Sequence, residues 1–360
     1  MKAVFVAGGT GGHVYPALSV AREYKKSGTE VYWIGRKSSL EQKLALEENF
    51  FFESIKTRAF RGKSLSEKIF SIFFFLLSVL SSIRILKKIK PDFIFSCGGF
   101  TSLGPGIASL FLNIPLFIHE QNSVAGSANK LLSKISLKAF EGFPSSFRKV
   151  SGVEFVGNPI RGEITNFIKG KDVLKDNKLE KFNLLILGGS QGSKQLNSIV
   201  MNCLEKIQEK VDWKITHQTG ESDKNRLDKF YSELDLEVVV VAFIKDIGKA
   251  YKEADLVISR AGAMTISELI AMEKPSILLP LPWATDNHQF LNASFLKENG
   301  LAEIISSKKE NVSKLATLVS NLARNKEKRL SMTNSAKLAF VPNAEKQIFL
   351  KINESIKDKS

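Results

Sequence analysis

The fold is decided by the stretch Ala3-Val4-Phe5-Val6-Ala7-Gly8-Gly9-Thr10-Gly11-Gly12-His13, an apolar run that passes through a glycine-rich turn into a helical pattern. The same design returns about half a chain later, in Leu184-Leu185-Ile186-Leu187-Gly188-Gly189-Ser190-Gln191-Gly192-Ser193. Continuous apolar runs are typical of strands that are buried on both faces of a parallel sheet. The pair therefore predicts two α/β domains, each a doubly wound parallel sheet, that face a central cleft.

Both glycine-rich turns are suited to binding phosphate. Glycine lets the backbone approach a ligand closely, and the helix that follows presents free N–H groups and a partial positive charge. Neither turn has the Gly-x4-Gly-Lys sequence of a P-loop, and Val14 stands where a dinucleotide fingerprint needs its third glycine. Nucleoside triphosphatases and nicotinamide or flavin enzymes are thus disfavoured, and a diphosphate ligand is favoured. Ordinary tight turns without a ligand are the alternative.

The length of 360 residues predicts two domains, at 1–160 and 161–341, and a helix at about 342–360 that packs back on the first domain. Residues 162–181 are polar and rich in lysine, as in a linker. Met1-Lys2 leads directly into a strand without a secretory signal, so a cytosolic protein is expected. The two cysteines and four histidines lack the spacing of metal ligands.

The first domain is the more basic one, because residues 1–160 contain 21 Lys and Arg against 11 Asp and Glu. Its basic residues flank the uncharged run Ile69–Ile83, which as a helix is about 22 Å long, too short to cross a bilayer core of about 30 Å. On a helical wheel Ser64, Ser71, Ser78 and Ser82 form a stripe that is expected to face solvent. Phe75 falls within this stripe, and Phe74 lies beside it.

Two interpretations of this helix stay open. It is either a core helix whose aromatic side chains are covered by the preceding loop, or a helix that rests on a membrane. In the second case Phe74, Phe75, Lys87 and Lys88 contact anionic lipids. A nucleic-acid partner is not expected, since the sequence contains no recognition-helix, zinc or aromatic-stacking motif.

Polar motifs follow the later strands of both domains, where the carboxyl ends of parallel strands form a ligand-binding edge. The motifs are Gly98-Gly99, His119-Glu120-Gln121-Asn122, Val156-Gly157-Asn158-Pro159-Ile160-Arg161, the segment from Arg260 to Glu268, and the segment from Pro280 to Gln289.

The chain resembles the bacterial glycosyltransferases of peptidoglycan synthesis that convert lipid I to lipid II. The resemblance rests on the two glycine-rich turns, His119-Glu120-Gln121-Asn122, the motif from Val156 to Arg161, and the segment from Arg260 to Glu268. The similarity covers most of the chain, and motifs in this order and spacing are highly specific. It implies a GT-B fold of two Rossmann-like domains, with UDP-N-acetylglucosamine held mainly by the second domain and lipid I by the first. It implies no metal or other cofactor. It also implies a peripheral enzyme at the cytoplasmic face of the inner membrane, with other cell-wall synthesis proteins as further partners.

The resemblance also implies roles for individual residues. Glu268 would accept hydrogen bonds from the ribose hydroxyls, the backbone of Ile244 would meet the uracil edge, and Ser190 would face the diphosphate. The rest of the donor site would come from Ala263, Met264, Thr265, Ile266, Ser267, Asn122 and Arg161, with Thr10, Gly11 and Gly12 closing on it from the first domain. Family members often have paired glutamines where this chain has His288-Gln289, so either residue is a candidate for reading the sugar hydroxyls.

Direct displacement with inversion is the simplest reaction, in which the acceptor C4 hydroxyl attacks the anomeric carbon of the donor. Such a reaction needs a base. His13 is the first candidate, because an imidazole at a helix N-terminus is biased toward its neutral form; binding phosphate or orienting the loop is its alternative role. His119 and Glu120 are the second candidates, with shaping the acceptor pocket as the alternative.

Two other functions remain open at this point. A UDP-sugar epimerase of the same architecture would also hold UDP-N-acetylglucosamine with a carboxylate and glycine-rich turns. A non-catalytic nucleotide-sugar sensor at the membrane is the other.

Overall fold

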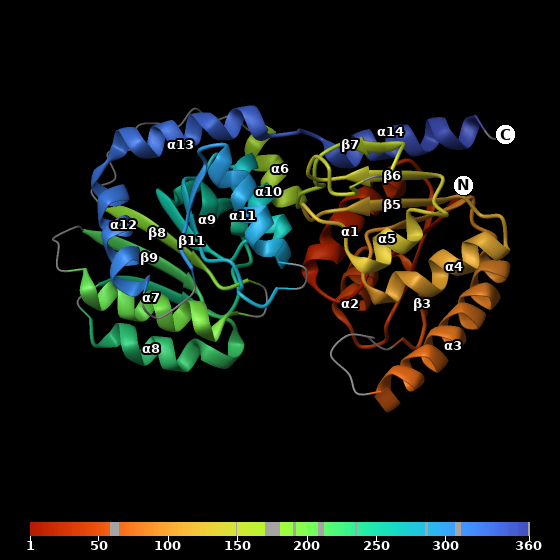
Figure 1. Ribbon diagram of the computed structural model, residues 1–360, viewed down its shortest axis with the longest axis horizontal. Helices are drawn as coiled ribbons and strands as arrows, with labels where there is room; N and C mark the ends of the chain where they lie inside the picture. The colour runs from red at the N-terminus through yellow and green to blue at the C-terminus, as the bar shows by residue number, and fades with distance from the viewer. Residues whose placement is uncertain are drawn as a thin grey trace. The chain divides into compact units, whose positions relative to one another are not determined.

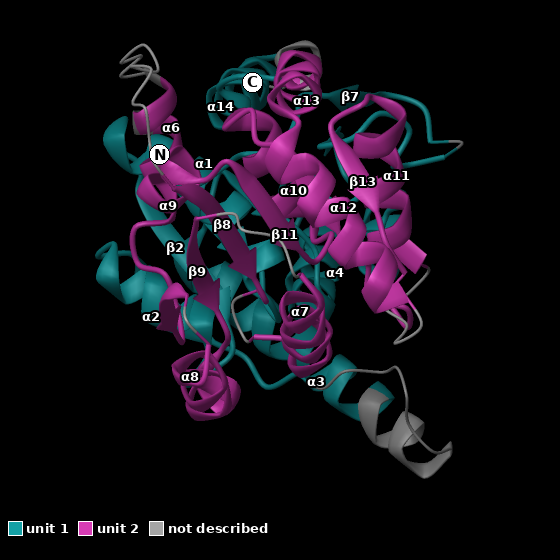
Figure 2. Ribbon diagram, turned by 90° about the vertical axis from the view of Figure 1, so that its left-hand side faces the viewer, with its two compact units in different colours: residues 1–161, 341–360 teal, residues 162–340 magenta. Residues whose placement is uncertain are grey.

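The computed structural model describes residues 1–57, 65–148, 150–169, 181–189, 192–207, 212–234, 236–284, 287–306 and 311–358. The chain forms two compact units, coloured separately in Figure 2. Unit 1 consists of Met1–Arg161 together with Val341–Ser360, and unit 2 is Gly162–Phe340.

Unit 1 is built on a seven-stranded parallel sheet with the strand order β3-β2-β1-β4-β5-β6-β7. Its strands β5, β6 and β7 are labelled in Figure 1. Its strands are β1 (Lys2–Val6), β2 (Glu30–Gly35), β3 (Phe51–Ser54), β4 (Phe93–Ser96), β5 (Leu116–Glu120), β6 (Lys138–Glu141) and β7 (Val153–Phe155). Its helices are α1 (Gly11–Lys26), α2 (Leu40–Glu47), α3 (Leu65–Ile89), η1 (Phe100–Ser102), α4 (Leu103–Phe111), α5 (Ser127–Leu132) and α14 (Ala344–Lys357).

The alternation of side chains along β1 divides the core of unit 1 into two layers. Ala3 and Phe5 pack with α1, α2 and α14 on one face, whereas Val4 and Val6 pack with α3, α4 and α5 on the other. A sheet with helices on both faces explains why its strands are continuously apolar.

Unit 2 has a six-stranded parallel sheet with the order β10-β9-β8-β11-β12-β13. Its strands are β8 (Phe182–Leu187), β9 (Trp213–Gln218), β10 (Glu237–Val241), β11 (Leu256–Ser259), β12 (Ser276–Leu278) and β13 (Ala302–Ile304). Its helices are α6 (Gly162–Lys169), α7 (Lys194–Lys206), η2 (Glu221–Asp223), α8 (Lys224–Ser232), α9 (Ile247–Glu253), α10 (Ala263–Ala271), α11 (His288–Glu298), α12 (Val312–Arg324) and α13 (Lys326–Ala339). Two parallel α/β sheets confirm the predicted fold class.

The structure differs from the sequence prediction at α6 and at β5. Residues 162–169 were expected to belong to a polar linker, but they form α6, which packs against α9 because Phe167 and Ile164 give it an apolar side. The strand β5 extends to Glu120, so His119 and Glu120 lie in the sheet rather than in the loop after it.

The last helix, α14, belongs to unit 1 and packs on α1. The ring of Phe349 lies 4.7 Å from that of Tyr24, and the Tyr24 hydroxyl donates to Asn353 Oδ1 at 3.3 Å. Ile348 and Ile352 are fully buried in the same core as β1. The chain thus returns to its first sheet after completing the second.

The stripe of α3 that was expected to meet solvent is buried at Ser78 and Ser82, whereas Ser64 and the side chain of Ser71 lie outside the described residues. A Cβ atom at Gly104 of α4 would lie 2.1 Å from Ser78 Oγ. Small residues let the two helices approach closely, so the serines mark a helix interface instead of a wet face. Phe74 and Phe75 are half-buried. Among the described side chains of α3, the exposed large apolar ones are Ile72, Phe73, Leu76, Leu77 and Leu80.

None of the helices in the described ranges combines the length and apolar character needed to cross a bilayer.

We predict that Gly104→Ala lowers the free energy of unfolding by about 1–3 kcal/mol, because the added methyl group overpacks the α3–α4 interface. Urea denaturation measures the change. Gly126→Ala is the matched control, since a Cβ atom there has 3.8 Å to its nearest neighbour and the backbone φ is −67°. Equal stability of the two variants would contradict the proposed interface.

Candidate functional site

The first glycine-rich turn lies against the turn that follows β4. A Cβ atom at Gly99 would be 2.4 Å from the carbonyl oxygen of Gly8, and φ of Gly99 is +82°. A Cβ atom at Gly8 would in turn lie 2.5 Å from Thr101 Oγ1. Only glycine fits at this contact between the two turns. Thr10, the next residue but one after Gly8, is exposed. The N-terminus of α1, with Gly11 and Gly12, follows directly.

His13 lies in the first turn of α1 and is half-buried. Its Nδ1 is hydrogen-bonded to the side-chain amide of Gln121, which follows β5. The imidazole edge at Cδ2 faces Gly99, where an added Cβ atom would be 3.5 Å away. The structure therefore brings the first turn, the Gly98-Gly99 turn and the segment after β5 to one edge of the sheet.

Glu120 organises the segment after β5. Its Oε1 accepts from the backbone and side-chain N–H groups of Asn122, both at 2.9 Å. Its Oε2 accepts from Gly126 N and Asn129 Nδ2, also at 2.9 Å. The carboxylate is 1% exposed and uses both oxygens to hold the loop, which favours the structural role over that of a base.

His119 is fully buried, and its Nε2 lies 3.0 Å from the carbonyl oxygen of Gly157. Burial lowers the pKa of His119 to about 4, so the ring is neutral at neutral pH and donates to Gly157. A ring without access to an acceptor hydroxyl is a poor base, and His13 is the better candidate. The contact ties β5 to the segment that leads to Arg161.

Arg161 ends unit 1, and its guanidinium lies over the ring of Tyr15 in α1, at 5.3 Å from the ring centroid. Such a cation–π contact holds the charge at the helix that carries His13. Asn122 is held by Glu120, and its carbonyl oxygen accepts from Ser146 Oγ at 2.7 Å.

The second glycine-rich turn has a similar design within unit 2. Gly192 has φ +76°, and a Cβ atom there would lie 2.2 Å from the carbonyl oxygen of Thr219 after β9. Ser193 caps α7 by accepting from Leu196 N at 3.3 Å. Ser190, the residue expected at the diphosphate, lies outside the described residues.

Arg260, the residue directly after β11, supports this turn. Its guanidinium donates to Ser193 Oγ at 2.9 Å and to Gln195 Oε1 at 3.0 Å, and it is 7% exposed. Burial lowers its pKa to about 10, so the group is still cationic at neutral pH. A fixed positive charge at the N-terminus of α7 suits a diphosphate.

Gln218, at the end of β9, was not singled out from the sequence. Its Nε2 donates to Gly189 O at 2.8 Å, and its Oε1 accepts from Ile244 N at 3.0 Å. The side chain thereby joins the second turn to the loop that is expected to meet uracil. Its position at the carboxyl end of a parallel strand is the signal that could have identified it.

Glu268 lies in α10 and is 2% exposed. Tyr251 of α9 donates its hydroxyl to Glu268 Oε2 at 3.1 Å, which orients the carboxylate. In the first turns of α10, Thr265 is half-buried, while Ala263, Met264, Ile266 and Ser267 are buried. Ser267 Oγ donates to Ala263 O at 3.0 Å.

His288 begins α11, and Gln289 follows it. Gln289 Oε1 accepts from Leu281 N at 2.9 Å and so holds the loop after β12. Both residues are half-buried.

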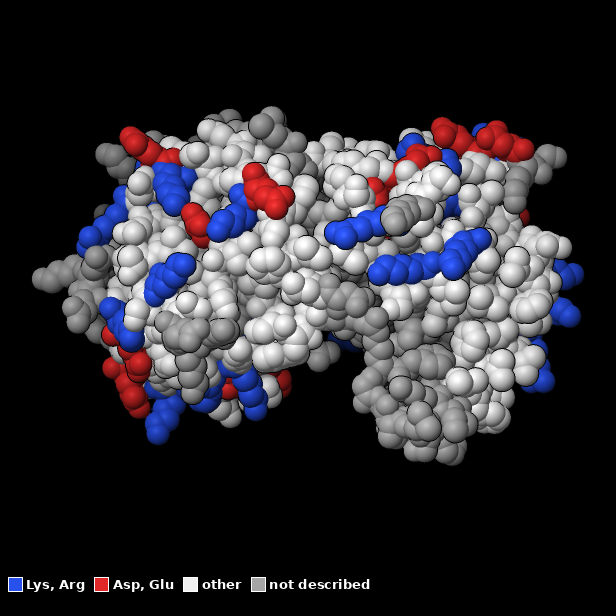
Figure 3. All heavy atoms as spheres, viewed as in Figure 1, with Lys and Arg blue, Asp and Glu red and all other residues white. Residues whose placement is uncertain are grey.

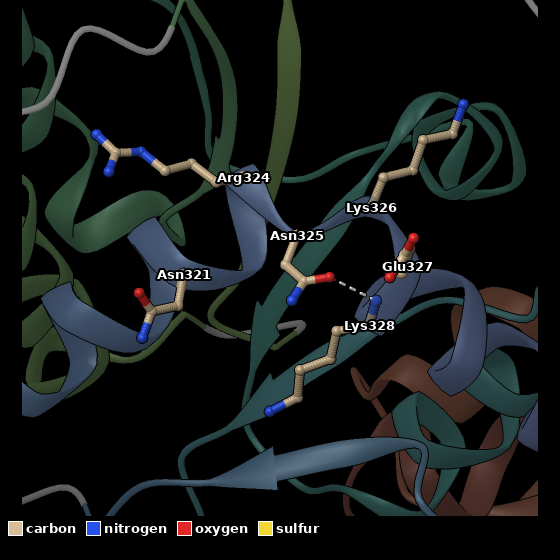
Figure 4. A pocket seen from close by; sticks show the side chains of 6 residues that line it. All are labelled: Asn321, Arg324, Asn325, Lys326, Glu327 and Lys328. Atoms are coloured by element: carbon tan, nitrogen blue, oxygen red, sulfur yellow. Dashed lines mark hydrogen bonds between the residues drawn. The ribbon is translucent and has the colours of Figure 1, made fainter.

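A hollow in the surface of unit 2 lies apart from these loops. It has a volume of 650 Å³, lies at the junction of α12 and α13, and is lined by exposed side chains, among them Arg324 and Lys328 (Figure 4). Within the described ranges no group of three or more His, Cys, Asp and Glu residues is placed to hold a metal ion.

We predict that acid destabilises unit 1 partly through His119. Its pKa is about 4 in the folded chain against 6.5 for a free imidazole, so the unfolded state binds more protons between these values. The free energy of unfolding therefore falls as the pH decreases through this window. His119→Gln, which can still donate to Gly157, should reduce the slope by up to about 1.4 kcal/mol per pH unit. Denaturation between pH 4 and pH 7 measures it, and an unchanged slope would refute the assignment.

The comparisons with known proteins cover both units. The glycosyltransferase family 28 N-terminal domain matches residues 3–141, and the glycosyltransferase family 28 C-terminal domain matches residues 183–348. A Coxiella burnetii protein named UDP-N-acetylglucosamine--N-acetylmuramyl-(pentapeptide) pyrophosphoryl-undecaprenol N-acetylglucosamine transferase is 35% identical over 347 residues, 96% of each chain.

Solved structures agree with the fold. The crystal structure of Acinetobacter baumannii MurG has a TM-score of 0.80 and 31% identity, covering 98% of this chain and 99% of that one. The UDP-GlcNAc 2-epimerase of Neisseria meningitidis, with a TM-score of 0.68 over 98% of this chain and 100% of its own, is 15% identical and shares the fold alone. With both family domains matched in order and a relative 35% identical along nearly the whole chain, this protein belongs to glycosyltransferase family 28.

Proposed function

We propose that this protein transfers N-acetylglucosamine from UDP-N-acetylglucosamine to the C4 hydroxyl of the N-acetylmuramoyl residue of lipid I, which gives lipid II. The observation that carries the proposal is the similarity, along 96% of both chains, to a relative named for this reaction. UDP-N-acetylglucosamine and lipid I are therefore the substrates of the proposed enzyme.

Unit 2 would hold the donor. The buried Glu268 carboxylate, oriented by Tyr251, has the chemistry to accept from the two ribose hydroxyls. The N-terminus of α7 and the cationic Arg260 would stabilise the diphosphate as it leaves. Ile244 N–H is engaged by Gln218, so uracil would either use the carbonyl of Ile244 or replace the glutamine.

Unit 1 would hold the acceptor and the base. The acceptor C4 oxygen attacks the anomeric carbon, the bond from that carbon to the UDP oxygen breaks, and UDP leaves with the electron pair. His13 takes the proton of the hydroxyl as the new bond forms. One displacement of this kind inverts the anomeric configuration. In a reaction without a metal ion, backbone N–H groups and arginine side chains would stabilise the negative charge on the departing UDP.

The exposed side of α3 would rest on the cytoplasmic face of the membrane that carries lipid I. Ile72, Leu76 and Leu80 are 53%, 54% and 56% exposed, and the exposed cations Arg84, Lys87 and Lys88 follow in the same helix. In Figure 3 the described surface over α3, at the lower right, is uncharged, and basic side chains stand at its right-hand edge. Each cation near an anionic bilayer contributes about 1 kcal/mol.

The C-terminal half would bind UDP-N-acetylglucosamine in an epimerase or a sensor as well, and the reaction products separate these alternatives. We predict that the chain moves labelled N-acetylglucosamine from the nucleotide into the lipid fraction, with many turnovers, and only when lipid I is present. Conversion of the free nucleotide sugar without lipid I would indicate an epimerase. Release of UDP that stops after one turnover, or is absent, would refute a transferase.

In the same assay Glu268→Gln should raise the KM for UDP-N-acetylglucosamine by about 10-fold to 100-fold, the equivalent of losing charge-assisted hydrogen bonds worth about 1.5–3 kcal/mol. Glu298→Gln is the matched control, because Glu298 is an exposed carboxylate at the end of α11. An unchanged KM in Glu268→Gln would contradict the proposal that Glu268 binds the ribose hydroxyls.

For the membrane contact, the triple variant Ile72→Ser, Leu76→Ser, Leu80→Ser should bind vesicles containing phosphatidylglycerol at least about tenfold more weakly than the parent chain. The control is Leu46→Ser, Leu330→Ser, Leu350→Ser, which removes three side chains of matched exposure, 55%, 51% and 57%, from other surfaces. Co-sedimentation measures both. Equal losses in the two triple variants would argue against docking through α3.

A further inference from the structure

We propose that Gln121 is a positioning residue that fixes the orientation and tautomer of the His13 imidazole, so that Nε2 is the atom that accepts the proton. This inference rests on the role of His13 in the proposed transfer reaction. In many active sites a base activates the nucleophile and a third group orients the base; Gln121 would be that third group here.

The contact itself joins two loops that are far apart in the sequence. The Gln121 side-chain amide is hydrogen-bonded to His13 Nδ1 across 108 residues of chain, and Gln121 is only 1% exposed. The imidazole is also bounded by Gly99, where a Cβ atom would lie 3.5 Å from Cδ2. With one ring nitrogen bonded and one edge against a glycine backbone, the ring has little freedom to turn.

Gln121 is itself held in place on both sides. Its carbonyl oxygen accepts from Asn158 Nδ2 at 3.0 Å, which anchors it to the segment after β7. Glu120 immediately before it accepts four hydrogen bonds and fixes the loop from Asn122 to Asn129. An orienter must be more rigid than the group it orients, and these contacts supply that rigidity.

The chemistry of an amide decides the tautomer. If the amide oxygen faces His13, it accepts from Nδ1–H and leaves a lone pair on Nε2; if the nitrogen faces His13, the proton moves to Nε2 and the base is blocked. The two ends of an amide have nearly the same shape, so hydrogen bonding decides between them. In the structure it is Gln121 Nε2 that faces His13 Nδ1, and the buried Gln121 Oε1 then has no hydrogen-bond donor among the described residues. The reversed orientation places that oxygen on Nδ1–H.

A neutral orienter also has a consequence for the proton affinity of the base. A carboxylate at this place would stabilise the imidazolium and raise the pKa of His13, whereas an amide fixes the ring without that charge. The ionisable groups packed around these loops are engaged elsewhere. Glu41, behind Gly8, accepts from Arg36 N and lies 3.7 Å from Arg36 Nε; Glu120 and His119 have the partners described above.

The first experiment replaces the amide. Gln121→Met keeps the length of the side chain and removes the hydrogen bond, and it should lower kcat by about 10-fold to 100-fold while the KM for UDP-N-acetylglucosamine stays within about twofold. Gln121→Glu should retain more activity than Gln121→Met, and the acidic limb of its kcat profile should move up by about one pH unit. Asn353→Leu is the control, because it removes an amide that accepts from Tyr24, eleven residues beyond His13 on α1. It should leave kcat unchanged.

The second experiment separates this inference from the proposed function. In a His13→Asn background, Gln121→Met should cost nothing further in kcat, because the group it orients is gone. An undiminished kcat in Gln121→Met alone, or an equal loss in both backgrounds, would overturn the positioning role while lipid II synthesis still stands. No transfer by the parent chain would instead refute the proposed function.

A spectroscopic measurement tests the tautomer without any turnover. Nitrogen-15 imidazole spectra of the whole chain at neutral pH, with His13 assigned by its loss in His13→Asn, should show the proton on Nδ1. In Gln121→Met the His13 signals should move toward a mixture of the two tautomers. A proton found on Nε2 in the parent chain would overturn the inference.

Discussion

The close contact between neighbouring strand-to-helix turns is the constraint on which the rest of each unit depends. In unit 1 the backbone of Gly99 lies against the carbonyl oxygen of Gly8, and in unit 2 Gly192 lies against that of Thr219. A side chain at either glycine would push the turns apart, because the space is filled by backbone atoms. The parallel sheets bring the carboxyl ends of the strands together, and the glycines let the loops there touch.

Buried polar side chains then hold these loops in one arrangement. Glu120 gathers four N–H donors, His119 ties β5 to Gly157, and Gln218 joins Gly189 to Ile244. Each of these side chains stands at the end of a strand, where it reaches loops on both sides. Because a buried polar group is costly unless it is bonded, such a network has few alternative arrangements. The exposed or half-buried groups that remain, such as His13 and Thr10, are therefore presented from a rigid frame.

The helix α3 shows where sequence patterns mislead. On a helical wheel its serines form a stripe that resembles a solvent-exposed face, yet Ser78 and Ser82 are buried. A wheel separates polar from apolar residues, but it does not distinguish a small residue that faces water from one that admits a neighbouring helix. The partner, Gly104, is 26 positions away, and only the packing shows that the two meet. Because the serine face packs on α4, apolar side chains of α3 such as Leu76 and Leu80 are exposed to solvent.

The sequence by itself determined the two α/β sheets, since continuous apolar strands, glycine-rich turns and helical patterns are local signals that agree with one another. It also indicated the loops that carry the candidate residues, because polar motifs after parallel strands gather at one edge. Only the tertiary structure decided what each residue does there. Gln121 and Gln218 are ordinary glutamines until the sheet places them beside His13 and Ile244. His119 is fully buried and bonded to the Gly157 carbonyl oxygen, whereas His13 is half-buried and bonded to Gln121. Burial and hydrogen-bond partners arise from contacts between segments distant in sequence, which no local pattern records.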